Sequence, residues 1–113
     1  MGVPFAQDHT TVSAGPYQLT ALGNSQITVS GVVGLGSGVN AAGAAVAIPN
    51  GVRQAVITVE TANVRWCDDG QTPTTAFGQL LTSGQTLSYV GDHSAIKFIA
   101  VTGTPVLDVA FYR

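Results

Sequence analysis

Charge is the scarcest ingredient of this sequence. Charged residues make up 9% of the chain and its net charge at pH 7 is −2, whereas a typical soluble domain is about 25% charged. The four basic residues, Arg53, Arg65, Lys97 and Arg113, are too few for the basic surface that binds phosphate backbones. We therefore expect no nucleic-acid partner. Because few charges oppose self-association, we expect a homo-oligomer or an assembled particle.

Long apolar runs and paired cysteines are also missing. No stretch approaches the roughly 20 apolar residues of a membrane-spanning helix, and no basic segment precedes an apolar one at the start of the sequence. Cys67 is the single cysteine, so an internal disulfide is excluded. These features predict no membrane partner and synthesis in a reducing cytoplasm.

What the sequence has in quantity is short runs of alternating apolar and polar residues. The alternating apolar positions are Ile27 and Val29, then Ile57 and Val59, then Leu107, Val109 and Phe111. Turn-forming residues separate such runs about every ten residues, and no segment has a helical period. The pattern predicts an all-β fold: an antiparallel β-sandwich or a jelly-roll-like small barrel of about eight short strands.

The same pass along the chain predicts its boundaries. Residues 1–16 are expected to form an extended N-terminal arm, with a frayed terminus as the alternative, and residues 17–113 a single β-sandwich domain. Gly23-Asn24 predicts a hairpin turn, and the Gly/Ala-rich residues 31–51 a long loop that leads into a short strand at Ala44–Ile48. A break is expected near Ala62-Asn63.

Residues with catalytic or metal-binding chemistry are present but poorly arranged. "GLGSG" at residues 34–38 lacks the spacing of a phosphate-binding loop. The possible metal ligands, His9, His93, Cys67, Asp68, Asp69 and Asp92, include no CxxC or HxxxH pair. Asp92-His93-Ser94 has the letters of a catalytic triad, yet triads are assembled across a fold rather than along a sequence. We therefore predict no catalytic, cofactor-binding or metal-binding residue, and a protein that is not an enzyme.

The most unusual segment is "RWCDDGQTPT", residues 65–74. Asp68, Asp69 and Gly70 predict a structural turn, because Gly adopts positive φ easily and Asp tolerates it. Arg65 is expected to pair with one of the two carboxylates. Trp66 is expected either to close one end of the core or to anchor a subunit contact. Cys67 is predicted to be a small packed residue, and an intersubunit disulfide stays open.

Residues 64–113 carry a more specific pattern. It consists of Trp66 followed by Asp68-Asp69-Gly70, Pro73-Thr74, a hairpin from Leu81 to Leu87, "GDHSAIKFI" from Gly91 to Ile99, and Phe111-Tyr112 at the end. This pattern resembles that of small all-β structural proteins of tailed bacteriophage virions. The resemblance covers under half of the chain, and Cys67 departs from it, because a polar residue is usual there.

The resemblance implies a virion protein, made in the bacterial cytoplasm, that decorates and stabilises the capsid as a cement protein. The implied partners are the major capsid protein or other virion subunits, with a trimer favoured for the homo-oligomer. The candidate contact residues are Phe5, Tyr17, Leu35, Val39 and Trp66. The resemblance implies no cofactor and supplies no catalytic residue. A neck, tail or fibre-associated role is the first alternative. A glycan-binding module, with Trp66 beside Asp68 and Asp69, is the second.

Overall fold

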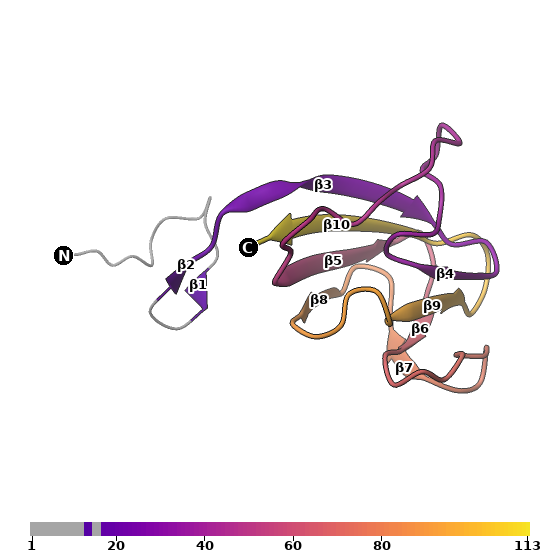
Figure 1. Ribbon diagram of the computed structural model, residues 1–113. Coiled ribbons are helices and arrows are strands. Elements are labelled where there is room, and N and C mark those ends of the chain that lie inside the picture. The colour runs from indigo at the N-terminus through magenta and orange to yellow at the C-terminus, as the bar shows by residue number, and fades with distance from the viewer. Residues whose placement is uncertain (1–12, 15–16) are drawn as a thin grey trace.

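The computed structural model describes residues 13–14 and 17–113, and over these residues the chain is all-β (Figure 1). Two four-stranded antiparallel sheets face each other. Sheet I contains, in spatial order, β3 (Ala21–Thr28), β10 (Val106–Tyr112), β5 (Gln54–Glu60) and β8 (Thr86–Tyr89). Sheet II contains β4 (Val32–Gly34), β9 (Lys97–Ala100), β6 (Val64–Cys67) and β7 (Gln79–Leu81). No helix of membrane-spanning length and hydropathy occurs in the described ranges.

The strand pairing is that of a jelly roll. β3 pairs with β10, β4 with β9, β5 with β8 and β6 with β7, each time antiparallel. The topology is that of one long antiparallel hairpin that has been folded over, so that successive strand pairs lie alternately in sheet I and sheet II. The predicted all-β sandwich is confirmed, and its eight strands lie between Ala21 and Tyr112.

The core lies between the two sheets and is built by alternation along the strands. Leu107, Val109 and Phe111 of β10 point inward from sheet I, and Phe98 of β9 points inward from sheet II. Ile27, Val29, Ile57 and Val59 are also fully buried, as their period of two predicts. Phe98 and Phe111 are among the largest fully buried side chains, so they carry much of the apolar burial.

Two expectations about local structure are corrected. Gly23-Asn24 lies inside β3 rather than in a turn, because this strand pairs with β10 along its whole length. Residues 44–48 form no strand and make one isolated bridge, Val39 to Ala45. Tyr17–Gln18 (β2) pairs with Ser13–Ala14 (β1) in a small separate ladder, drawn apart from both sheets in Figure 1. The expected break near Ala62-Asn63 is confirmed, since β5 ends at Glu60 and β6 begins at Val64.

A paired comparison of two phenylalanines tests where the core lies. Phe98→Ala is expected to lower the free energy of unfolding by about 3–5 kcal/mol, because it opens a cavity between the sheets. Phe77→Ala removes a ring that is 48% exposed and is expected to change stability by under about 1 kcal/mol. Urea unfolding followed by circular dichroism measures both. Equal losses for the two variants would contradict the burial of Phe98 and the exposure of Phe77.

Candidate functional site

The loop from Asp68 to Gly78, between β6 and β7, folds back against its own sheet. Arg65 holds it there: its Nε donates to the Thr75 carbonyl at 3.2 Å and its Nη1 to the Gly78 carbonyl at 3.0 Å. Pro73 is fully buried beneath the loop. The predicted pairing of Arg65 with Asp68 or Asp69 is therefore corrected. Its guanidinium donates instead to two backbone carbonyls, and no sequence pattern identifies these acceptors.

Gly78 allows the loop to come this close. Its φ is 127°, and a Cβ there would lie 3.1 Å from the Trp66 carbonyl oxygen and 3.2 Å from the Arg65 Cβ. A side chain at position 78 would therefore strain the backbone and press on β6. The close approach places Phe77 directly beside the end of β6.

The Asp69-Gly70 step changes the direction of the chain. Gly70 has a φ of 90°, and the Asp69 carboxylate accepts hydrogen bonds from the Gln71 amide at 3.2 Å and from its Nε2 at 3.0 Å. Such a contact, from an Asp side chain to the backbone two residues ahead, stabilises turns. Asp69 is thereby held in one orientation at the rim of the loop.

Asp68 is held by a residue from the other sheet. The Tyr89 hydroxyl, at the end of β8, donates to Asp68 Oδ2 at 2.9 Å and contacts the Asp92 carbonyl oxygen at 3.2 Å. The Tyr89 ring packs edge-on against Trp66 and His93, with centroids 6.1 Å and 5.2 Å away. Burial, followed by the hydrogen bond to the Asp68 carboxylate, raises the pKa of Tyr89 to about 12. This phenol stays protonated and remains a donor at neutral pH.

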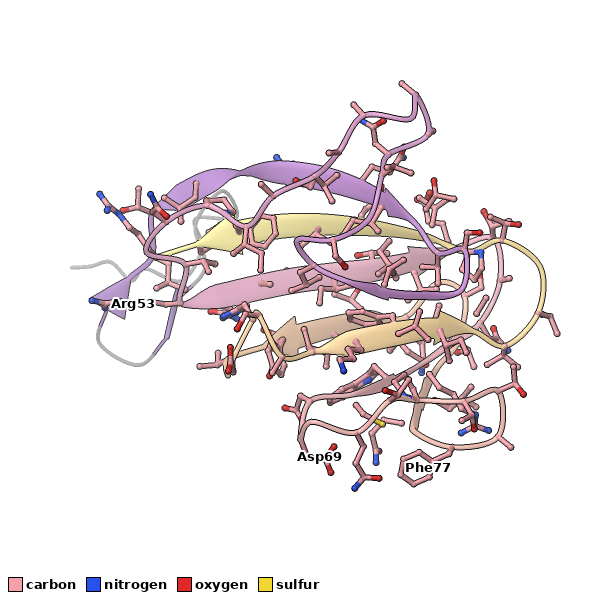
Figure 2. The ribbon with its side chains drawn as sticks, turned by 45° about the vertical axis from the view of Figure 1, so that its right-hand side comes forward. Arg53, Asp69 and Phe77 are labelled. Atoms are coloured by element: carbon pink, nitrogen blue, oxygen red, sulfur yellow. The ribbon has the colours of Figure 1, made fainter. Side chains whose placement is uncertain are left out.

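These elements enclose an open groove of about 530 Å³ at one end of the sandwich. Six residues define its chemistry: Trp66, Cys67, Asp68, Asp69, Phe77 and Gln79. In Figure 2 the ring of Phe77 and the carboxylate of Asp69 lie at the same lower edge, while Arg53 lies at the far end of the molecule. The groove thus has aromatic and polar walls side by side.

Cys67 is buried in the floor of the groove. Burial is the main cause, and the carboxylates of Asp69 and Asp68 are further causes, of a raised pKa for this thiol. The thiol is therefore protonated at neutral pH and is a poor nucleophile. Within the described ranges, no three His, Cys, Asp or Glu side chains gather as metal ligands would.

The segment Asp92-His93-Ser94 forms a turn and no relay. Asp92 Oδ1 accepts from the Ser94 amide at 3.0 Å and from the Ser94 hydroxyl at 2.5 Å. These bonds lower the pKa of Asp92. The buried His93 ring instead contacts the Tyr89 carbonyl oxygen at 3.3 Å. Serine and histidine are thus directed to different partners, whereas a nucleophile needs its base within reach.

The candidate contact residues fall in different environments. Phe5 lies outside the described residues, and for Tyr17 the structure describes the backbone alone. Leu35 is 1% exposed and belongs to the core, so its side chain does not face a partner. Val39 is 44% exposed. Trp66 is half-buried: it packs against the core and also lines the groove.

The outer face of sheet II has an apolar row that spans all four strands. Val32, Ile99, Arg65 and Leu80 are successive cross-strand partners in β4, β9, β6 and β7. Val32 is 44% and Leu80 is 49% exposed, and Ile99 is partly exposed. Because Arg65 has its charged end in the loop, its aliphatic stem completes the row.

The outer face of sheet I is mostly polar. Most of its outward positions carry hydroxyls, amides or carboxylates, with side-chain hydrogen bonds from Gln26 to Asp108, between Thr58 and Thr86, and from Gln54 to Ser88. Val56 and Ala110, which are cross-strand partners, also face outward. Glu60 and Asp108 lie on this face, and their side-chain hydrogen bond and charge repulsion raise the pKa of Glu60. The two outer faces of the sandwich therefore differ in polarity: sheet I is mostly polar outside, whereas sheet II carries the apolar row.

Three of these residues escape sequence reasoning: Phe77, Leu80 and Tyr89. Leu80 and Leu81 are adjacent, and only strand register shows which one faces outward. Tyr89 meets Asp68 across 21 positions of sequence. A weak signal exists for Phe77, because a large apolar residue next to Gly in a turn has no strand alternation to bury it.

No protein-family model matches the chain, and neither a curated protein nor a solved structure is found to be similar to it.

The Glu60 and Asp108 pair predicts a pH-dependent stability. Because the pKa of Glu60 is raised in the folded state, folding is favoured while Glu60 is protonated and opposed once pH rises through that pKa. Glu60→Gln should therefore raise the midpoint of thermal unfolding at about pH 7 and leave it nearly unchanged at about pH 3. Calorimetry at the two pH values checks this. A lower midpoint at neutral pH would show that the two carboxylates do not repel.

The bond from Tyr89 to Asp68 gives a second prediction. Tyr89→Phe keeps the ring packed against Trp66 and removes the hydrogen bond, so it should cost about 1–2 kcal/mol of unfolding free energy. The single Trp66 provides a fluorescence readout of unfolding and of the local change. Thr86→Val, on the same strand, is the comparison: it removes the exposed hydrogen bond to Thr58 and should cost less, because water can replace that bond. An unchanged stability in Tyr89→Phe would mean that the bond does not form.

Proposed function

We propose that this protein is a capsid decoration protein of a tailed bacteriophage, which binds the assembled head shell through the outer face of sheet II. The main support for this proposal is the apolar row of Val32, Ile99 and Leu80 across that face, which the aliphatic stem of Arg65 completes. In a chain with 9% charged residues, an ordered apolar row is suited to a large, water-excluding contact with another protein. The resemblance of residues 64–113 to phage virion proteins supports the identity of that partner.

The jelly-roll fold is compatible with a decoration role but also with other functions. Jelly rolls occur in viral capsid proteins and in lectins, among others, so the fold alone is an analogy. A decoration protein must remain folded while it is held between shell subunits, and a two-sheet core meets that need. We propose in addition that it acts as a homo-oligomer, with a trimer expected at symmetric positions of the shell. Sedimentation equilibrium of the purified protein tests that number.

The site on the particle is tested by imaging. Gold-labelled antibodies against the protein should decorate the whole head of intact virions of the encoding phage. Label confined to one vertex or to the tail would replace decoration with the neck, tail or fibre role. An intact particle without label, examined with an antibody that works on the purified protein, would overturn the virion assignment.

The contact surface is tested by a double variant. Val32→Thr with Leu80→Gln preserves side-chain size while making the row polar, and should weaken binding to shells that lack the protein by tenfold or more, since each buried aliphatic side chain contributes about 1.5–3 kcal/mol. Cosedimentation with such shells measures the loss. Val56→Thr, on the outer face of sheet I, is the matched control. If Val56→Thr weakened binding and the double variant did not, the contact would lie on the opposite face.

A further inference from the structure

We propose that the groove between Phe77 and the Asp68-Asp69 turn binds an uncharged saccharide. This function goes beyond attachment to a shell and does not rest on it, because the groove and the apolar row use different side chains. The volume of about 530 Å³ lies within the range of 300–1,000 Å³ that is usual for small-molecule sites. It accommodates one or two sugar rings.

The walls of the groove match the two surfaces of a sugar ring. A pyranose presents a face of C–H groups and a rim of hydroxyls. The exposed ring of Phe77, together with the half-buried Trp66, offers aromatic surface to the C–H face. The carboxylates of Asp68 and Asp69 accept from hydroxyls, and the amide of Gln79 both donates and accepts.

Most of these groups are held in place before any ligand arrives. Phe77 lies in a tight turn, where the Phe77 and Thr74 backbones exchange hydrogen bonds of 2.9 Å and 3.2 Å. Tyr89 holds Asp68 and Gln71 holds Asp69. Arg65 fixes the loop that carries Phe77. Little conformational entropy is therefore lost when a ligand enters, which favours binding of a small and weakly interacting molecule.

The charges of the groove restrict the ligand class. Two carboxylates line it, and the guanidinium of Arg65 is turned to the Thr75 and Gly78 carbonyls. Sulfated, phosphorylated or carboxylated sugars would meet these two like charges and are disfavoured, while Lys97, the cross-strand partner of Cys67, lies outside the lining. A lysine or arginine side chain of a protein partner would be attracted, but it needs only the carboxylates. A neutral saccharide uses the carboxylates, the amide and the aromatic ring together, so the full set of lining residues favours it.

The test is a titration of isotope-labelled protein, followed by NMR, with four neutral trisaccharides: maltotriose, cellotriose, mannotriose and triacetylchitotriose. We expect at least one to shift the Trp66 indole and the amides of residues 76–79 saturably, with a Kd on the order of 1 mM. Phe77→Ala and Asp69→Asn should each weaken that binding tenfold or more, while the double variant Val32→Thr, Leu80→Gln binds as the original does. Thermal unfolding confirms that every variant is folded.

Three outcomes would overturn the proposal: no saturable shift with any of the four sugars, binding that Phe77→Ala leaves unchanged, or shifts at these residues with trilysine and none with sugars. The groove and the shell contact remain separable. Loss of shell binding in the double variant with retained sugar binding supports both proposals. A protein that never binds shells, yet binds a sugar in a Phe77-dependent way, retains the groove and loses the decoration role.

Discussion

The register of β10 between β3 and β5 is the constraint on which the rest of the structure depends. β10 places Leu107 opposite both Ile27 and Val59, and all three are fully buried. Because side chains alternate with a period of two, a slip of one residue would turn Asp108 into the core and Leu107 into solvent. The burial of these rows therefore fixes which residues of sheet I face outward, and by closing the core it sets the position of sheet II.

Because side chains alternate along a strand, successive residues of β6 contribute to two different surfaces. Arg65 points outward, contributes its stem to the apolar row and holds the β6–β7 loop through two carbonyls. Trp66 points toward the core, contacts Tyr89 edge-on and lines the end of the sandwich where the groove opens. Neighbouring residues of one short strand thus support the two candidate surfaces. Because Arg65 serves both surfaces, the two are separated only by substitutions away from it, such as Leu80 in the apolar row and Phe77 in the groove.

Sequence reasoning reached the fold class because alternation is a local property. Ile57 and Val59 are visible as a period of two, and Glu60 to Val64 as a break. The turn prediction at Gly23-Asn24 is wrong because these two residues pair with Phe111 and Ala110 of β10, more than 80 positions away, and that pairing outweighs a local turn preference. Residues 44–48 were misread for the opposite reason. Their apolar character suits a strand, but within the part of the chain that the structure describes they make only the isolated bridge between Val39 and Ala45.

Some residues of the candidate site could be identified from the sequence, but their spatial arrangement could not. Trp66, Asp68 and Asp69 attract notice because they are adjacent and rare in this chain. The residues that complete the site lie further along the chain. Tyr89 in sheet I donates a hydrogen bond to Asp68, and a turn together with the close approach at Gly78 places Phe77 beside the same groove. Such contacts depend on loop closure and on packing between sheets, which short-range patterns do not encode. The same long-range contacts order the candidate groove, so its geometry is set as the two sheets pack together.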